Sequence, residues 1–117
     1  MRKTMGMWQE SVSLTATAAT GTVYSVPVPP GERWFLERIC YVNADDGSTT
    51  MIISIDGHSY NQYLHQLAAP VAATYYAIAL QVWLFEGQRL QFDLSGMTSG
   101  DNVRIFITGH KQGAKDG

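Results

Sequence analysis

The chain has 117 residues, of which 45% are hydrophobic and 11% aromatic, so it can fold as one domain around a core and is not a disordered chain. Its net charge of −2 and the absence of a basic run argue against nucleic acid as the main partner. Charged residues make up only 15% of the chain, and such a sparsely charged surface indicates that neighbouring molecules cover part of it.

The first twenty residues are rich in Thr, Ala and Ser and contain no apolar segment typical of a signal peptide. We expect an extended arm over 1–20 that lies on a neighbouring molecule and is anchored by Met5, Met7 and Trp8, because such side chains are unusual in a solvated tail. A disordered leader is the alternative. The sandwich domain is expected over 21–110, and a flexible tail over 111–117.

The stretch "VPVPPGERW", residues 26–34, combines three prolines with a glycine. Proline fixes φ and lacks a backbone donor, so this stretch cannot lie in the middle of a sheet. We expect a stiff rim that loses little entropy on binding, after which Gly31 turns the chain into the next strand. A rim of this kind suits a repeated docking contact, and it suits a plain β-corner equally well.

Two predicted strands, 33–43 and 74–85, are apolar on both faces. Strict alternation places Trp34, Leu36, Cys40 and Val42 on one face of the first strand, and Phe35, Ile39 and Tyr41 on the other. In the second strand Tyr75, Trp83 and Phe85 lie opposite Ile78, Leu80, Val82 and Leu84. Because one sandwich core cannot absorb both faces of two strands, we expect part of this surface to form an interface between molecules.

Alternating polar and apolar residues separated by short turns recur along the chain, with no confident helix between them. Strands are predicted over 11–17, 22–28, 33–43, 49–56, 74–85, 88–95 and 102–109. The stretch 60–73 is left open as loop, helix or strand. A membrane span over 68–85 is rejected because this segment contains Pro70, Thr74 and Gln81. These features predict an all-β antiparallel sandwich.

No catalytic or metal-binding signature stands out. His58, His65 and His110 match no ligand spacing, no nucleophile motif occurs, and no pair of carboxylates is selected as an acid–base pair. The single cysteine, Cys40, has apolar neighbours and is expected to be a buried thiol. We therefore predict neither an enzyme nor a cofactor or metal site.

The stretch "VPVPPGERWFLERICYVN" and the later "LFEGQRLQFDLSGMTSGDNVRIFITGHK" resemble small β-sandwich virion proteins of tailed bacteriophages, namely head decoration (cement) proteins and related head or tail accessory proteins. The likeness covers roughly residues 22–110. It implies a jelly-roll-like domain, often trimeric, that is bound to the outside of a capsid shell and has no active site.

The expected function is that of a structural virion protein that self-associates and binds a major capsid protein or another virion lattice protein, without nucleic acid or membrane. It would be made in the host cytoplasm and would stabilise the shell at the capsid surface. A carbohydrate-binding module that uses surface Trp and Tyr is the alternative, and a small enzyme is a third possibility. The candidate interface residues are Trp8, Pro29, Pro30, Phe35, Tyr41, Tyr75 and Trp83.

Overall fold

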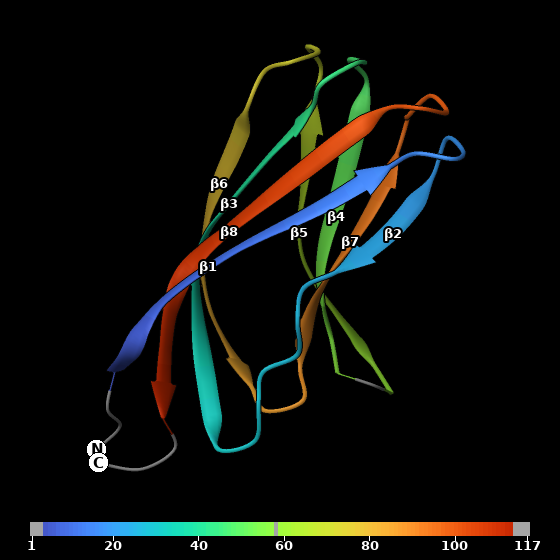
Figure 1. Ribbon diagram of the computed structural model, residues 1–117. Coiled ribbons are helices and arrows are strands. Elements are labelled where there is room, and N and C mark those ends of the chain that lie inside the picture. Colours follow the sequence, from blue (N-terminus) through green and yellow to red (C-terminus); the bar gives the residue numbers. More distant parts are fainter. Residues whose placement is uncertain (1–3, 58, 114–117) are drawn as a thin grey trace.

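The computed structural model describes residues 4–57 and 59–113, and this part of the chain contains eight strands and no helix (Figure 1). The strands are β1 (Thr4–Thr15), β2 (Gly21–Tyr24), β3 (Glu32–Asn43), β4 (Thr49–Asp56), β5 (Asn61–Ala69), β6 (Tyr76–Phe85), β7 (Arg89–Ser95) and β8 (Asn102–Gly113). Every pair of neighbouring strands is antiparallel.

The strands form two four-stranded sheets that pack face to face (Figure 1). Sheet A has the order β1-β8-β3-β6, and sheet B has the order β2-β7-β4-β5. Successive strands therefore alternate between the sheets, apart from β4 and β5, which pair as a hairpin. This order is that of a jelly roll, so the all-β, jelly-roll-like sandwich expected from the sequence is confirmed.

Four connections, 16–20, 44–48, 70–75 and 96–101, meet at the upper end of the sandwich in Figure 1, which we call the loop end. Asn43, fully buried at this end, links two of them and the first residue of β4 through its side chain. Its side-chain NH₂ donates to Thr49 Oγ1 (2.8 Å) and Asp101 Oδ2 (3.0 Å), and its side-chain oxygen accepts from the backbone N–H groups of Asp45 and Asp46. The loop end is thus held by buried hydrogen bonds in addition to the apolar packing of Ala16 and Met97.

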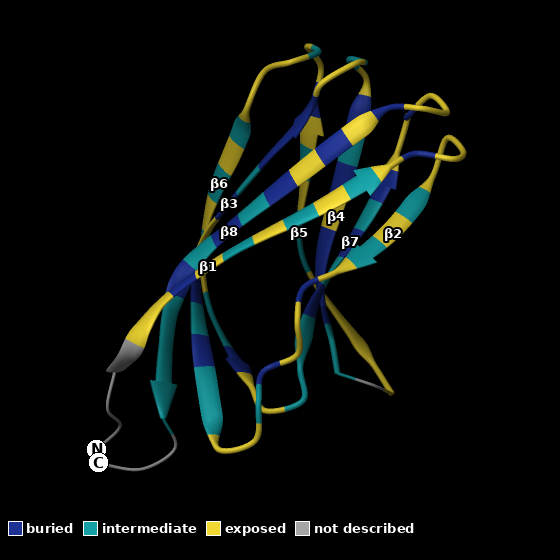
Figure 2. Ribbon diagram, viewed as in Figure 1, coloured by how far each residue is buried: buried dark blue, intermediate teal, exposed yellow. Residues whose placement is uncertain are grey.

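The core lies between the two sheets and is built by the alternation of side chains along each strand (Figure 2). Sheet B contributes Met51, Ile53 and Ile55 from β4 and Leu90, Phe92 and Leu94 from β7. Sheet A contributes Trp34, Leu36, Ile39, Tyr41 and Leu84, together with Val103, Ile105 and Ile107 of β8 and Trp8 of β1.

A β-bulge at Glu37 changes the phase of β3 and corrects the predicted faces. The register of β3 with both β6 and β8 shifts between Leu36 and Arg38. Because an extra residue flips all later side chains to the other face, Ile39 and Tyr41 join Trp34 and Leu36 in the core. Strict alternation had placed them on opposite faces of the strand.

The domain boundaries expected at 20 and 110 are wrong, because the terminal segments belong to the sandwich. Residues 4–15 form β1, which pairs with β8 along its length, so they are not an arm laid on a neighbour. Trp8 is only 1% exposed and packs in the core, while Met7 is exposed. At the other end β8 continues to Gly113, and residues 114–117 lie outside the described part of the chain.

Two other elements differ from the sequence prediction. The stretch left open at 60–73 contains strand β5, an edge strand paired with β4. Strand β2 ends at Tyr24, before the prolines, as their lack of a free N–H requires. The loop 25–31 is nevertheless ordered against sheet B, because Val28 exchanges backbone hydrogen bonds with Gly87 and Gln88. The expectation that the prolines do not lie in the middle of a sheet is confirmed, whereas the strand predicted over 22–28 ends at Tyr24 instead.

Candidate functional site

The outer face of sheet A, turned away from the core, carries the candidate site. Aromatic rings, small side chains and arginines share it. From β3 it presents Arg33, Phe35, Arg38, Cys40 and Val42; from β6 and the residue before it, Tyr75, Ala77, Ala79 and Trp83; and from β8, Arg104, Phe106 and His110. No other described segment of the chain packs over this face.

An aromatic cluster occupies the end of this face away from the loop end. The ring of Phe35 lies 4.8 Å from that of Trp83 and 5.2 Å from that of His110. The guanidinium of Arg33 stacks 4.3 Å above the Trp83 ring, and Nδ1 of His110 lies 2.9 Å from Glu37 Oε1. These contacts fix the rings against one another and leave them half-buried at the surface.

A second aromatic pair lies nearer the loop end. The rings of Tyr75 and Phe106 are 6.2 Å apart, and Tyr75 is 61% exposed. Cys40 pairs with Phe106 and with Ala77 in the sheet and is only partly covered on this outer face, so it is not the buried thiol expected from the sequence. Burial raises the pKa of the Cys40 thiol, and the charge of Arg38 opposes that rise. Cys40 is therefore mainly a neutral thiol at pH 7.

Arginines dominate the charge of this face. It carries Arg33, Arg38 and Arg104 against one carboxylate, Glu37, which contacts His110. Within residues 4–57 and 59–113, neither Arg38 nor Arg104 forms an ion pair. Arginine and aromatic side chains together are the composition typical of protein interfaces, where such residues contribute much of the binding energy.

The lateral edge formed by β5 and β6 lacks the charged side chains that usually prevent an edge strand from pairing with a strand of another molecule. Neither strand contains Asp, Glu, Lys or Arg, although each has only one hydrogen-bonded neighbour in its sheet. Tyr63 and Phe85, on these strands, are 62% and 50% exposed. Charges normally prevent edge strands from associating, so their absence here favours contact with another protein chain.

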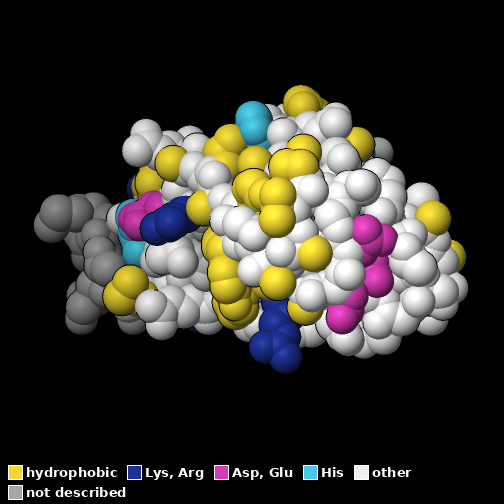
Figure 3. Space-filling model, turned by 90° about the horizontal axis from the view of Figure 1, so that it is seen from above, with side chains coloured by type: hydrophobic (Ala, Val, Ile, Leu, Met, Phe, Trp, Pro, Cys, Tyr) yellow, Lys and Arg dark blue, Asp and Glu magenta, His cyan; other side chains and the backbone are white. Residues whose placement is uncertain are grey.

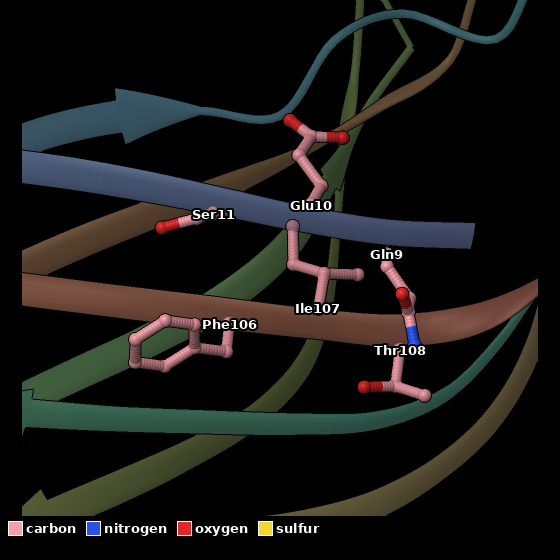
Figure 4. A pocket seen from close by; sticks show the side chains of 6 residues that line it. All are labelled: Gln9, Glu10, Ser11, Phe106, Ile107 and Thr108. Atoms are coloured by element: carbon pink, nitrogen blue, oxygen red, sulfur yellow. The ribbon is translucent and has the colours of Figure 1, made fainter.

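A shallow depression lies over β1 and β8, with a volume of about 350 Å³ (Figure 4). It is lined by Gln9, Glu10, Ser11, Phe106, Ile107 and Thr108. Glu10 is already engaged, since its carboxylate accepts hydrogen bonds from Trp8 Nε1 (3.1 Å) and from the backbone N–H of Val26 (2.8 Å). The depression thus offers no free acid or base.

The seven interface residues expected from the sequence divide into three groups. Phe35, Tyr75 and Trp83 lie on the outer face of sheet A, as an interface requires. Trp8 and Tyr41 are fully buried in the core, so the prediction is wrong for these two. Pro29 and Pro30 lie in the loop before β3. They belong neither to the outer face of sheet A nor to the core.

Sequence reasoning missed the arginines and His110 on the outer face of sheet A. Arg104 alternates with core residues of β8 and was therefore visible as an outward side chain, but nothing in the sequence placed β8 beside β3. That pairing sets Phe35 opposite His110 and Val42 opposite Arg104. Only the sheet order gathers these residues into one surface.

Within the described residues, no group of three or more His, Cys, Asp or Glu side chains is placed to hold a metal ion. His65 lies on β5, away from His110, and His58 lies outside the described residues. In that same part of the chain, no helix is long and apolar enough to cross a membrane.

Neither a protein-family model nor a curated protein matches the sequence. Among solved structures, the chain is similar to the Drosophila NLP core, whose structure is described as giving insight into pentamer formation and histone binding. The two share 18% identity over 91% of this chain and 97% of the other, with a TM-score of 0.50. A structure of infectious bursal disease virus, Gt strain, matches with 11% identity and a TM-score of 0.45, and this chain spans 32% of it. The first likeness supports the sandwich fold.

Proposed function

We propose that this protein is a non-enzymatic structural protein that self-associates and is incorporated into a larger protein lattice. The observation that carries the proposal is the outer face of sheet A, which no described segment covers. Half-buried aromatic rings stand there beside Arg38 and Arg104, which form no ion pair with any described residue. Burial of apolar area against a neighbour would stabilise both partners, and a standard interface buries about 1,600 Å² in total.

The lattice we propose is the capsid shell of a tailed bacteriophage, with the protein attached to its outer surface as a decoration or cement protein. The sequence resemblance over 22–110 supports this assignment, and a jelly roll is a fold that virion proteins use widely. Contacts between subunits and with the major capsid protein would oppose outward pressure on the shell.

Two measurements test the proposal at different levels. Light scattering coupled to size-exclusion chromatography, over a concentration series, reads the number of copies in solution. We expect a homo-oligomer, and a monomer at the highest concentration would contradict self-association. Quantitative mass spectrometry of purified virions then reads the copy number. Hundreds of copies per particle support a shell protein, whereas a handful would contradict the decoration role.

Variants of the aromatic cluster connect these measurements to the outer face of sheet A. Trp83→Ala removes a ring that packs on Phe35 and Arg33 at the surface, and we expect it to weaken binding to the shell. Tyr60→Ala, in the turn between β4 and β5, is the matched control, because its ring is 52% exposed but lies outside sheet A. Equal shell binding by both variants would contradict this placement of the binding face.

Glycan binding receives less support from the geometry. A sugar-stacking platform needs an open ring face, and one face of Trp83 is covered by the Arg33 guanidinium at 4.3 Å. Tyr75 is exposed, but it stands beside a hollow rather than on a flat row of rings.

A further inference from the structure

An exposed tyrosine stands directly beside a hollow where the outer face of sheet A meets the loop end. Tyr75 is 61% exposed, and the hollow has a volume of about 310 Å³. Its walls come from three separate parts of the chain: Val42 and Ala44, Ala73 and Tyr75, and Asn102 and Arg104 of β8. The protruding ring and the hollow therefore belong to one surface patch.

Backbone hydrogen bonds hold the walls of this hollow in place. The N–H of Ala73 donates to the carbonyl oxygen of Asn43 (2.8 Å), and the N–H of Ala44 donates to that of Asn102 (2.9 Å). Ala73 has φ of +56°, a conformation that non-glycine residues adopt at a cost, just before the chain reaches Tyr75. A hollow fixed in this way loses little conformational entropy when it is filled.

Opposite charges lie at the border of the same patch. Arg104 lines the hollow and forms no ion pair within the described residues. Asp45 Oδ2 accepts hydrogen bonds from the backbone N–H (2.8 Å) and side-chain NH₂ (3.2 Å) of Asn102, another wall residue. A cation and an anion thus both lie next to the hollow. Figure 3, seen from the loop end, shows acidic and basic side chains flanking a group of hydrophobic ones.

We propose that a second copy of this chain docks here across a two-fold axis, so that Tyr75 of each copy enters the hollow of the other. Arg104 of each copy then faces Asp45 of the second copy. A patch that carries its own knob, hole, cation and anion is self-complementary, which is the requirement of an isologous contact. This inference deepens the proposed function, since it rests on self-association and names the contact.

Size and charge both favour a second copy as the occupant. An apolar cavity of about 150 Å³ is enough to bind benzene, so a hollow of about 310 Å³ has room for a phenol ring. A purely acidic or purely basic partner would leave Arg104 or Asp45 facing a like charge. A second copy satisfies both charges at once, because the two-fold axis places its Asp45 opposite Arg104 and its Arg104 opposite Asp45.

Replacement of the knob is the first test. We expect Tyr75→Ala to weaken self-association by about tenfold or more, because buried tyrosines at the centre of an interface act as hot spots. Tyr60→Ala is the matched control, since Tyr60 is 52% exposed but lies in the turn between β4 and β5, away from the hollow. Sedimentation velocity over a concentration series measures both dissociation constants. Equal constants for the two variants overturn the proposed contact.

Charge exchange is the second test and is independent of the first. Arg104→Glu and Asp45→Lys should each weaken association, whereas the double variant should recover tenfold or so of the loss because the pair is restored in reverse. Thermal unfolding followed by circular dichroism confirms that each variant is folded. A folded double variant that associates no more tightly than the single variants overturns the pairing.

The outcome for the unmodified protein separates this inference from the broader proposal. If it self-associates and Tyr75→Ala leaves the association unchanged, the two-fold contact is wrong while the structural role stands. If it remains a monomer at the highest concentration, both fail. The contact joins copies in pairs, so we expect an even number of copies rather than the trimer implied by the sequence resemblance.

Discussion

The hydroxyl group of Tyr41, on β3, lies 2.6 Å from the backbone carbonyl oxygen of Leu67, on β5, and so links sheet A to sheet B through the core. The same hydroxyl lies 3.1 Å from the carbonyl oxygen of Thr49. Tyr41 is fully buried, so the phenol group is satisfied only by these two acceptors. The residue expected at an interface between molecules instead joins the two layers of one molecule.

Removal of this hydroxyl should destabilise the fold without altering its shape. We expect Tyr41→Phe to lower the free energy of unfolding by about 1–2 kcal/mol, because the hydrogen bonds from the buried hydroxyl to the carbonyl oxygens of Leu67 and Thr49 are lost. Urea denaturation measures the change. Tyr63→Phe, which removes an exposed hydroxyl on β5, is the control and should stay within about 0.5 kcal/mol of the unmodified protein. An equal loss in both variants would contradict the role assigned to the Tyr41 hydroxyl.

The same burial predicts a loss of stability in alkali. Burial raises the pKa of Tyr41 well above its ordinary value of 10.0, and the nearby Tyr76 adds to the rise. The unfolded chain releases the phenolic proton first, so this contribution to stability is complete below about pH 10 and declines as the pH rises further. Urea midpoints at pH 8 and pH 11 measure the decline. Tyr41→Phe should show a smaller decline over that range, and an identical decline would refute the assignment.

Asn43 provides a separate test at the loop end. Asn43→Ala removes two donated and two accepted hydrogen bonds and leaves the Asp101 carboxylate with fewer donors. We expect a loss of about 3 kcal/mol or more in the free energy of unfolding, since buried partners are left unsatisfied. Asn61→Ala, at an exposed position of β5, should cost far less. If urea denaturation gives similar losses for the two, the network does not hold the loop end as described.

The sandwich could be predicted from the sequence because its strands β7 and β8 alternate cleanly and turn residues separate the predicted strands. The faces taken by the β3 side chains after Glu37 could not be predicted. A β-bulge adds one residue, and no sequence pattern reveals it in a strand that is apolar on both faces. Ile39 and Tyr41 were therefore assigned to opposite faces from Trp34 and Leu36, whereas all four lie in the core.

The strand predicted over 11–17 in fact begins at Thr4, and this N-terminal part of β1 was missed for a different physical reason. Trp8 lies opposite Gly109 in the β1–β8 register, and this contact joins residues that are about a hundred positions apart. Sequence patterns within a short window carry no information on such a long-range pairing. An apolar residue near a terminus is therefore easily interpreted as a contact with a neighbouring molecule. Of the candidate site, Phe35, Tyr75 and Trp83 could be found because they are surplus aromatic residues in strands whose other face fills the core. Arg104 and His110 needed the sheet order.

Gly109 itself is a position where only glycine fits. A methyl group added there would overlap the backbone carbonyl oxygen of Phe35 and meet the Trp8 ring at 3.2 Å, so β8 would have to move away from β3. We expect Gly109→Ala to lower the free energy of unfolding by about 3 kcal/mol, at the upper end of overpacking effects. Gly100→Ala is the matched control, because a methyl group there meets nothing within 4 Å and its cost comes from the positive φ of +97° alone, about 1–2 kcal/mol. Urea denaturation compares the two, and a Gly109→Ala loss no larger than that of Gly100→Ala would show that β1, β8 and β3 do not pack as closely as this geometry requires.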